Sequence, residues 1–197
     1  MKLGAVVIIT GPSAAGKSTL VDEMLRRHPS AARLVTTTTR APRPGEVDGR
    51  DYHFTTPEDF TTRRDRGEFL EWAEVHAHFY GSSREVLQRL RINHPIVFGV
   101  VDVQGTETIK GVLPEANVVY VDAGSIREIR RRLSERPGTT PEDLERRVRN
   151  AAREQRFVTE RADLVSLVVV NRDGRLDEAI ERLDSFVTGI LTSGPIK

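Results

Sequence analysis

The chain has 197 residues, of which 38% are hydrophobic and 30% charged, so it is long enough for one domain with a buried core. Its formal net charge of +1 favours neither acidic nor basic partners, and the absence of cysteine excludes disulfides, thiolate metal sites and a cysteine nucleophile. The longest apolar runs have the length of a strand and fall well short of the roughly 20 residues that a membrane span requires. Together with an N-terminus unlike a signal peptide, these features predict a cytoplasmic protein.

Short apolar runs alternate with amphipathic stretches along the chain, which predicts an α/β fold with a parallel sheet. The runs are rich in β-branched residues and alternate little with polar ones, as expected for strands that are covered on both faces. We predict the core strands at residues 5–9, 33–36, 96–101, 118–121 and 164–170.

Several helix starts are marked by capping patterns. Thr56 and Thr140 are each followed by Pro and two acids, which is typical of an N-cap residue with Pro at the first helical position. Ser82 and Ser125 each precede a Glu by three residues, the spacing of a capping box. The helix that follows Thr140 is expected to bury one face, made of Leu144, Val148, Ala151 and Ala152.

Two segments interrupt this alternation. Residues 37–80 are polar with short mixed elements, and residues 135–140 form a loop containing Pro, Gly and Thr between two Arg-rich helices. Insertions of this kind between core elements often act as lids or binding loops.

Residues 11–18 read GPSAAGKS and match the phosphate-binding pattern G-x-x-x-x-G-K-[ST] between a predicted strand and a predicted helix. Backbone N–H groups of such a loop approach phosphate oxygens, and the helix N-terminus favours negative charge. Lys17 is expected to reach the β- and γ-phosphates, and the Ser18 hydroxyl to hold Mg²⁺. The motif predicts a nucleoside triphosphate site without identifying the reaction. The predicted ATP-binding residues here are Gly11, Pro12, Ser13, Ala14, Ala15, Gly16, Lys17, Ser18 and Thr19.

A second group of residues suits a phosphate dianion. Arg40 and Arg43 lie close together in a Pro-rich loop, and two guanidinium groups can bind one phosphate through paired hydrogen bonds. Neutral donors are available from the hydroxyls of Thr36, Tyr52, Tyr80 and Ser82. Taken alone, the loop fits a solvated basic segment equally well.

Read in order, several motifs resemble the guanylate kinase family. They are TTTRAPRPGE at 37–46, GRDYHF at 49–54, EFLEW at 68–72, YGS at 80–82, DVQG at 102–105 and the Arg-rich segment that follows. The resemblance runs from about residue 6 to residue 183. It implies a P-loop nucleoside monophosphate kinase fold and transfer of the γ-phosphate of ATP to GMP, with dGMP as a second acceptor and Mg²⁺ as cofactor.

The resemblance also implies how one domain, residues 1–197, is divided. The core is expected at about 1–36, 82–134 and 157–197, the GMP-binding region at about 37–81, and a helical lid at about 135–156.

Neither a nucleic acid nor a membrane is expected as a partner. A nucleic acid is not expected because acids are interspersed among the lid arginines and no stacking aromatics accompany them.

The family's binders of the GMP phosphate match Arg40, Arg43, Tyr52 and Tyr80. Its readers of the guanine ring match Glu71, Thr36 and Ser82, and the acid that assists them matches Asp102. The chemistry agrees, because guanine offers N1–H and an exocyclic NH₂ on one edge and a carboxylate accepts from both. Adenine lacks that donor pair and would leave a buried Glu unpaired.

Residues 127–156 hold ten Arg and six acids. In the family, arginines matching Arg132, Arg136 and Arg147 close on the triphosphate and stabilise the transferring phosphoryl group; with Lys17 and Arg40 they complete the predicted catalytic set. Asn171 matches a family contact to adenine, and as an Asn beside a turn it fits a structural role equally well.

The chain departs from the family pattern at two positions. Val100 stands where the family usually has an acid that supports Mg²⁺, which leaves Asp102 to serve the metal, the base or both; alternatively, Mg²⁺ rests on Ser18, the phosphates and waters. Ala14 stands where the family usually has Gly, and a positive φ there would strain the loop by about 1 kcal/mol or more.

These departures keep two alternatives open. One is a diverged kinase that acts on another guanine-type nucleotide. The other is a catalytically weak GMP-binding module, comparable to the guanylate-kinase-like domains of scaffold proteins. Retention of Lys17, Ser18 and the lid arginines favours the enzyme.

Overall fold

The computed structural model describes residues 3–75, 77–135 and 138–192. Within these ranges the predicted parallel sheet is present, with its strands in the order β2, β7, β1, β8, β9. The strands are β1 (Ala5–Thr10), β2 (Ala32–Leu34), β7 (Ile96–Val100), β8 (Asn117–Asp122) and β9 (Leu167–Val170). The α/β class expected from the sequence is therefore confirmed.

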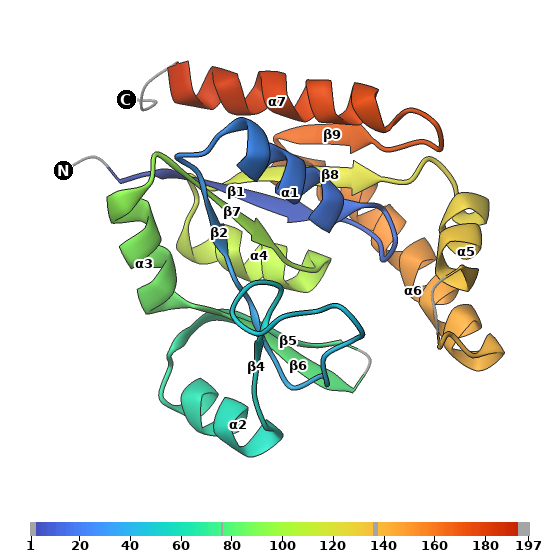
Figure 1. Ribbon diagram of the computed structural model, residues 1–197, viewed down its shortest axis with the longest axis horizontal. Helices are drawn as coiled ribbons and strands as arrows, with labels where there is room; N and C mark the ends of the chain where they lie inside the picture. The colour runs from blue at the N-terminus through green and yellow to red at the C-terminus, as the bar shows by residue number, and fades with distance from the viewer. Residues whose placement is uncertain (1–2, 76, 136–137, 193–197) are drawn as a thin grey trace.

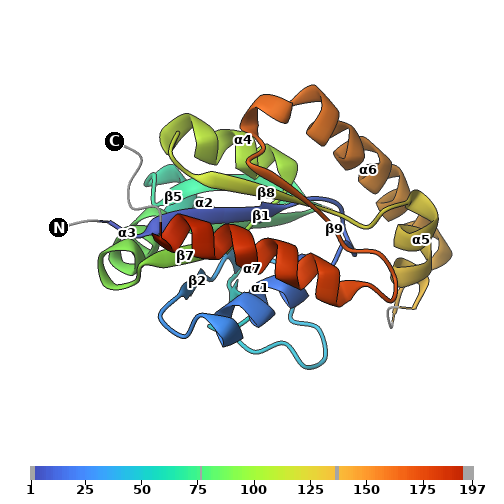
Figure 2. The ribbon, with the colours of Figure 1, turned by 90° about the horizontal axis from the view of Figure 1, so that it is seen from above.

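Both faces of this sheet are covered by helices, as Figures 1 and 2 show. Val7 and Ile9 of β1 pack into one apolar cluster, whereas Val6 and Ile8 pack into another on the opposite face. The first cluster includes α1 (Lys17–Arg27) and α7 (Leu176–Thr192), and the second includes α3 (Arg84–Asn93) and α4 (Val103–Val112). Burial on both faces explains why the strands read as nearly continuous apolar runs.

The position of β1 sets the place of the site. It is the central strand, with β7 on one side and β8 on the other. The loop after β1 and the loop after β7 are therefore neighbours at the carboxyl edge of the sheet, where open parallel sheets bind ligands. This arrangement brings the predicted phosphate-binding loop close to Asp102.

A smaller mixed sheet, with strand order β4, β3, β6, β5, holds the region predicted to bind the acceptor. Its strands are β3 (Thr37–Thr38), β4 (His53–Phe54), β5 (Phe69–Val75) and β6 (His78–Ser83), and α2 (Pro57–Asp65) packs beside it. The ring of Phe60 in α2 stacks on Phe69 and Phe79, with centroid distances of 4.5 and 5.4 Å. Figure 1 shows this unit apart from the main helix layers.

Two further helices, α5 (Ile126–Ser134) and α6 (Pro141–Glu160), flank the predicted lid loop, as Figure 2 shows. Ser125 and Thr140 cap them as predicted, each accepting a hydrogen bond from the backbone N–H three residues later. Thr56 caps α2 in the same way. Across the described ranges, no helix combines the length and the apolar character needed to cross a bilayer.

The predicted buried face of α6 is partly wrong. Val148 and Ala151 are buried and Leu144 packs against the same cluster, but Ala152 is exposed. The next turns of the helix pack instead through Phe157, whose ring stacks on Tyr120 of β8 at a centroid distance of 6.5 Å.

Three predicted boundaries also need correction. The strand predicted at 33–36 ends at Leu34, because the chain then crosses to the second sheet. The strand predicted at 164–170 begins at Leu167, after a 3₁₀ turn at Ala162–Leu164. Ser82 is not the cap of α3: Ser83 accepts from the Val86 N–H, whereas the Ser82 hydroxyl is turned into the interior.

Candidate active site

The phosphate-binding loop connects the end of β1 to the start of α1, as predicted. Gly16 has φ +93°, and a Cβ at this position would lie 2.2 Å from the Asn171 side-chain nitrogen, so no larger residue fits. The Lys17 ammonium donates to the carbonyls of Gly11 at 2.5 Å and Pro12 at 2.9 Å. These contacts place a positive charge at the mouth of the loop.

Ala14 lies in the left-handed region with φ 66°. The concern raised by the sequence is therefore justified, because a side chain with a Cβ costs about 1 kcal/mol in that conformation. The strain is located in the loop predicted to hold the triphosphate.

Ser18 is the predicted magnesium ligand, and Asp102 is the carboxylate that could join it. Ser18 is exposed at the start of α1, and Asp102 caps α4 by accepting from the Gly105 N–H at 2.8 Å. Burial raises the pKa of Asp102, while the Gly105 N–H and the charge of Lys17 act in the opposite direction. No cluster of three or more metal-ligating side chains occurs among the described residues. A hydroxyl and one carboxylate fit Mg²⁺, which retains water and takes phosphate oxygens as its other ligands.

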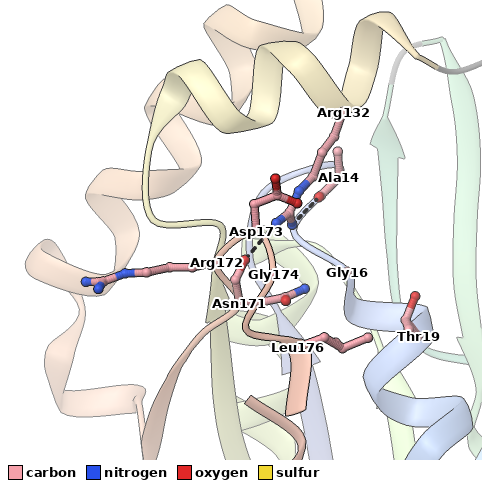
Figure 3. A pocket seen from close by; sticks show the side chains of 9 residues that line it. All are labelled: Ala14, Gly16, Thr19, Arg132, Asn171, Arg172, Asp173, Gly174 and Leu176. Atoms are coloured by element: carbon pink, nitrogen blue, oxygen red, sulfur yellow. Dashed lines mark hydrogen bonds between the residues drawn. The ribbon is translucent and has the colours of Figure 1, made fainter. Parts of the chain in front are cut away.

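A cavity of about 340 Å³ opens beside the phosphate-binding loop (Figure 3). It is lined by Ala14, Gly16, Thr19, Arg132, Asn171, Arg172, Asp173, Gly174 and Leu176. Asn171 is buried, and its side-chain nitrogen donates to the Ala15 carbonyl at 2.8 Å. This bond ties the turn after β9 to the loop. The contact from Asn171 to adenine remains a prediction.

Of the predicted lid arginines, Arg132 lies against the phosphate-binding loop. Its guanidinium donates to the carbonyls of Asn171 at 2.9 Å and Ala14 at 3.3 Å, and Glu128 holds its Nε at 2.7 Å. Arg147 is half-buried on α6 and pairs with Asp143 at 2.7 Å. Arg136 lies outside the described residues.

The predicted guanine-reading pair lies in the second sheet. Glu71 of β5 and Ser82 of β6 are cross-strand partners, and the Ser82 hydroxyl donates to the Glu71 carboxylate at 2.6 Å. Both side chains are buried. Burial raises the pKa of Glu71 to about 7, with a smaller upward contribution from Asp102 and an opposing one from Ser82. Its charged form is therefore short of hydrogen-bond donors.

Gly105 links this pair to the phosphate-binding side. A Cβ on Gly105 would lie 2.7 Å from Oε2 of Glu71 and 3.2 Å from Oδ1 of Asp102. The first turn of α4 therefore packs directly on the Glu71 carboxylate. Thr36, the third predicted reader, is buried where the chain passes from β2 to β3.

Three of the predicted phosphate binders are brought together. The Arg40 guanidinium lies over the Tyr52 ring at 5.3 Å, and the rings of Tyr52 and Tyr80 meet edge to face at 5.9 Å. Burial lowers the pKa of Arg40, but Glu46 and Tyr80 outweigh this effect and hold that pKa above its ordinary value. The fourth, Arg43, is exposed.

The sequence reasoning did not identify Glu46 as part of this group. Its carboxylate accepts both from Arg40, at 2.9 Å to each oxygen, and from the Arg43 backbone N–H at 2.8 Å. An acid six residues after the first arginine of a Pro-rich loop was the available signal. Gly105 was also missed, although it closes the DVQG motif.

The chain is similar to known proteins over most of its length. The profile of the family described as guanylate kinase matches residues 4–189. A guanylate kinase from Aromatoleum aromaticum is 40% identical over 86% of this chain and 81% of its own. One from Mycobacterium sp. is 39% identical over 98% of this chain and 95% of its own.

The solved structure of a guanylate kinase from Anaplasma phagocytophilum superposes with a TM-score of 0.75 at 24% identity. The superposition covers 98% of this chain and 88% of the Anaplasma phagocytophilum chain, and it confirms the predicted fold. The family profile and the relatives at 39–40% identity extend over nearly the whole chain. This chain belongs to the guanylate kinase family.

Proposed function

We propose that the protein transfers the γ-phosphate of ATP to GMP, giving ADP and GDP, with dGMP as a second acceptor, in the cytoplasm. The observation that carries this proposal is the packing of a buried Glu71–Ser82 pair against the turn of α4 that also presents Asp102 beside Lys17. The first turn of α4 thus contacts the proposed base-reading pair, and its cap residue Asp102 lies on the side of the phosphate-binding loop.

The acceptor is selected by hydrogen bonding at the guanine edge. Ionised Glu71 accepts from N1–H and the exocyclic NH₂, while Ser82 and Thr36 offer hydroxyls. Arg40, Tyr52 and Tyr80 form a cationic and hydroxyl-rich wall for the GMP phosphate. Adenine places no donor pair against Glu71, so AMP leaves a buried carboxylate unsatisfied.

The donor side supplies charge and orientation. Backbone N–H groups of the phosphate-binding loop and the Lys17 ammonium bind the triphosphate, and Asn171 holds the loop in place. Mg²⁺, held by Ser18 with a contribution from Asp102, supplies charge neutralisation at the phosphates when bound. Lys17 and Arg132 stabilise the negative charge that develops on the transferring phosphoryl oxygens.

The lid is proposed to complete the site. Arg132 already contacts the phosphate-binding loop, and Arg147 is presented by α6. Together with Arg136, they are proposed to close on the phosphates once both substrates are bound. Because the lid closes only when both substrates are bound, hydrolysis of ATP by water is limited.

The test is ADP release with ATP and Mg²⁺ and with GMP, dGMP, AMP, CMP or UMP as acceptor. Turnover with GMP and dGMP, and near-background rates with the other three, are the expected result. A folded protein that binds GMP without releasing ADP would indicate the binding-module alternative, which Val100 favours. Turnover with a different nucleotide would indicate a diverged kinase.

A further inference from the structure

Glu154 is an acid of the predicted lid region that has no role in the proposed function. It lies in the C-terminal half of α6, where the Tyr120 hydroxyl of β8 donates to its backbone carbonyl at 3.1 Å. The Tyr120–Phe157 stacking holds the same turn of the helix. Glu154 is therefore anchored to the main sheet through its backbone, independently of its side chain.

Its carboxylate reaches the phosphate-binding loop. The Ser13 backbone N–H hydrogen-bonds this carboxyl group, and the positive charge of Lys17 acts on it. The Oε2 atom is buried and has no hydrogen-bond partner within the described ranges. Burial raises the pKa of Glu154 and the like charge of Asp102 adds to this, whereas Lys17 and the Ser13 N–H favour the ionised form.

Other acids of α5 and α6 have a different environment. Glu128 pairs with Arg131 and Arg132, and Asp143 pairs with Arg146 and Arg147. Glu145 pairs with Arg130. Those carboxylates are neutralised by neighbours on the lid, whereas Glu154 presents a buried acceptor oxygen to a loop that binds anions.

A carboxylate at this place has the wrong sign for a bare triphosphate. Like charges a few ångströms apart in a partly buried site repel one another, because the effective dielectric constant there is lower than that of water. A divalent cation that accompanies the triphosphate reduces this repulsion, because it neutralises most of the phosphate charge.

We propose that Glu154 is a specificity-determining residue that makes the phosphate-binding loop select metal-complexed ATP over metal-free ATP. The inference rests on the proposed function only in taking this loop as the ATP site. It gives α6 a role that does not require lid movement, since the helix places a carboxylate at Ser13 of the loop.

The test is equilibrium binding of ATP, by calorimetry at pH 8, in excess Mg²⁺ and in EDTA. For wild-type protein, the Kd in EDTA should greatly exceed the Kd in Mg²⁺. In E154Q, metal-free ATP should bind on the order of tenfold more tightly, as removal of one like charge predicts, with little change in the Mg²⁺ complex. E154D, which keeps the charge, should retain most of the wild-type ratio.

The matched control is E160Q, which removes an exposed acid from the end of the same helix. It should leave the ratio of the two Kd values unchanged. A thermal unfolding curve close to wild type confirms that E154Q is folded, as expected because the Tyr120 bond uses the backbone of residue 154.

Equal ratios in wild type and E154Q would overturn the inference while leaving the proposed function intact. Equal tightening of both forms of ATP would also overturn it, because Glu154 would then oppose nucleotide binding without regard to the metal. Wild-type protein that binds no ATP under either condition would overturn the proposed function and the inference together.

Discussion

At the scale of single residues, the carboxylate of Glu71 is buried with Ser82 as its hydrogen-bonding side chain. Burial raises its pKa to about 7, so this carboxyl group titrates near neutral pH in the empty protein. In the proposed complex, guanine supplies two N–H donors to the ionised form, so that GMP binding and deprotonation of Glu71 favour one another. The pKa of Glu71 should therefore fall when GMP binds.

This coupling predicts a specific titration. In the empty protein, the side-chain carboxyl carbon of Glu71 should titrate with a midpoint near 7, and saturation with GMP should lower that midpoint. The affinity for GMP should rise as pH increases from 6 to 8. Carbon-13 NMR of labelled glutamate, assigned by comparison with E71Q, measures both midpoints. A midpoint near the ordinary value of 4.5 in the empty protein would contradict the account.

Replacement of Glu71 by Gln should change acceptor use. The new amide turns one acceptor into a donor against guanine, so kcat/KM for GMP should fall roughly a hundredfold or more, while the affinity for ATP stays near wild type. The control is E74Q, which removes an exposed acid from the same strand. Unchanged preference for GMP over AMP in E71Q would refute the guanine-reading role.

Ala14→Gly should stabilise the protein. Relief of the left-handed strain at φ 66° gains about 1 kcal/mol or more, and the greater freedom of Gly in the unfolded chain offsets roughly half of it. Urea unfolding should therefore show a gain of about 0.5 kcal/mol. Ala15→Gly is the matched control: Ala15 is buried and does not share the positive φ of Ala14, so this change should destabilise. A loss of stability in Ala14→Gly would show that the strain argument is wrong.

At the scale of elements, the loop between β3 and β4 was predicted to bind phosphate through its arginines. The hydrogen bonds within this loop were not predicted. The two arginines were visible in the sequence, whereas the brace that Glu46 provides depends on how the loop folds back on itself. The prediction that Ser82 caps a helix was wrong for a related reason. Its spacing to Glu85 matched a capping box, but strand pairing with Glu71 turns its hydroxyl inward and shifts the cap to Ser83.

Glu46→Gln should weaken GMP binding through this loop. Loss of the paired bond to Arg40 leaves the guanidinium without its fixed orientation, so KM for GMP should rise several-fold with little change in KM for ATP. Steady-state kinetics with each substrate varied in turn measures the two constants. E58Q, an exposed acid on α2, serves as the control. An equal rise in both constants would indicate general damage to the fold.

At the scale of the whole molecule, the alternation of apolar strands and helices predicted the parallel sheet, and the motif after β1 predicted the position of the phosphate-binding loop. The sequence could not show that Gly105 packs on Glu71 or that Glu154 reaches Ser13, because these contacts join segments far apart in the chain. Predicted strand boundaries were wrong where pairing between strands overrides the local sequence pattern. One example is Leu34, where the chain crosses from one sheet to the other.

The phosphate-binding loop lies at the carboxyl edge of the parallel sheet and the proposed guanine-reading pair lies in the second sheet. The proposed function requires these two sites to act together in moving a phosphoryl group between nucleotides. The most direct measurement is phosphorus-31 NMR of the wild-type protein with equimolar ATP and GMP and excess Mg²⁺. The account predicts that ADP and GDP appear in a one-to-one ratio with no free phosphate. Release of ADP and inorganic phosphate without GDP, or no change in either nucleotide, would contradict it.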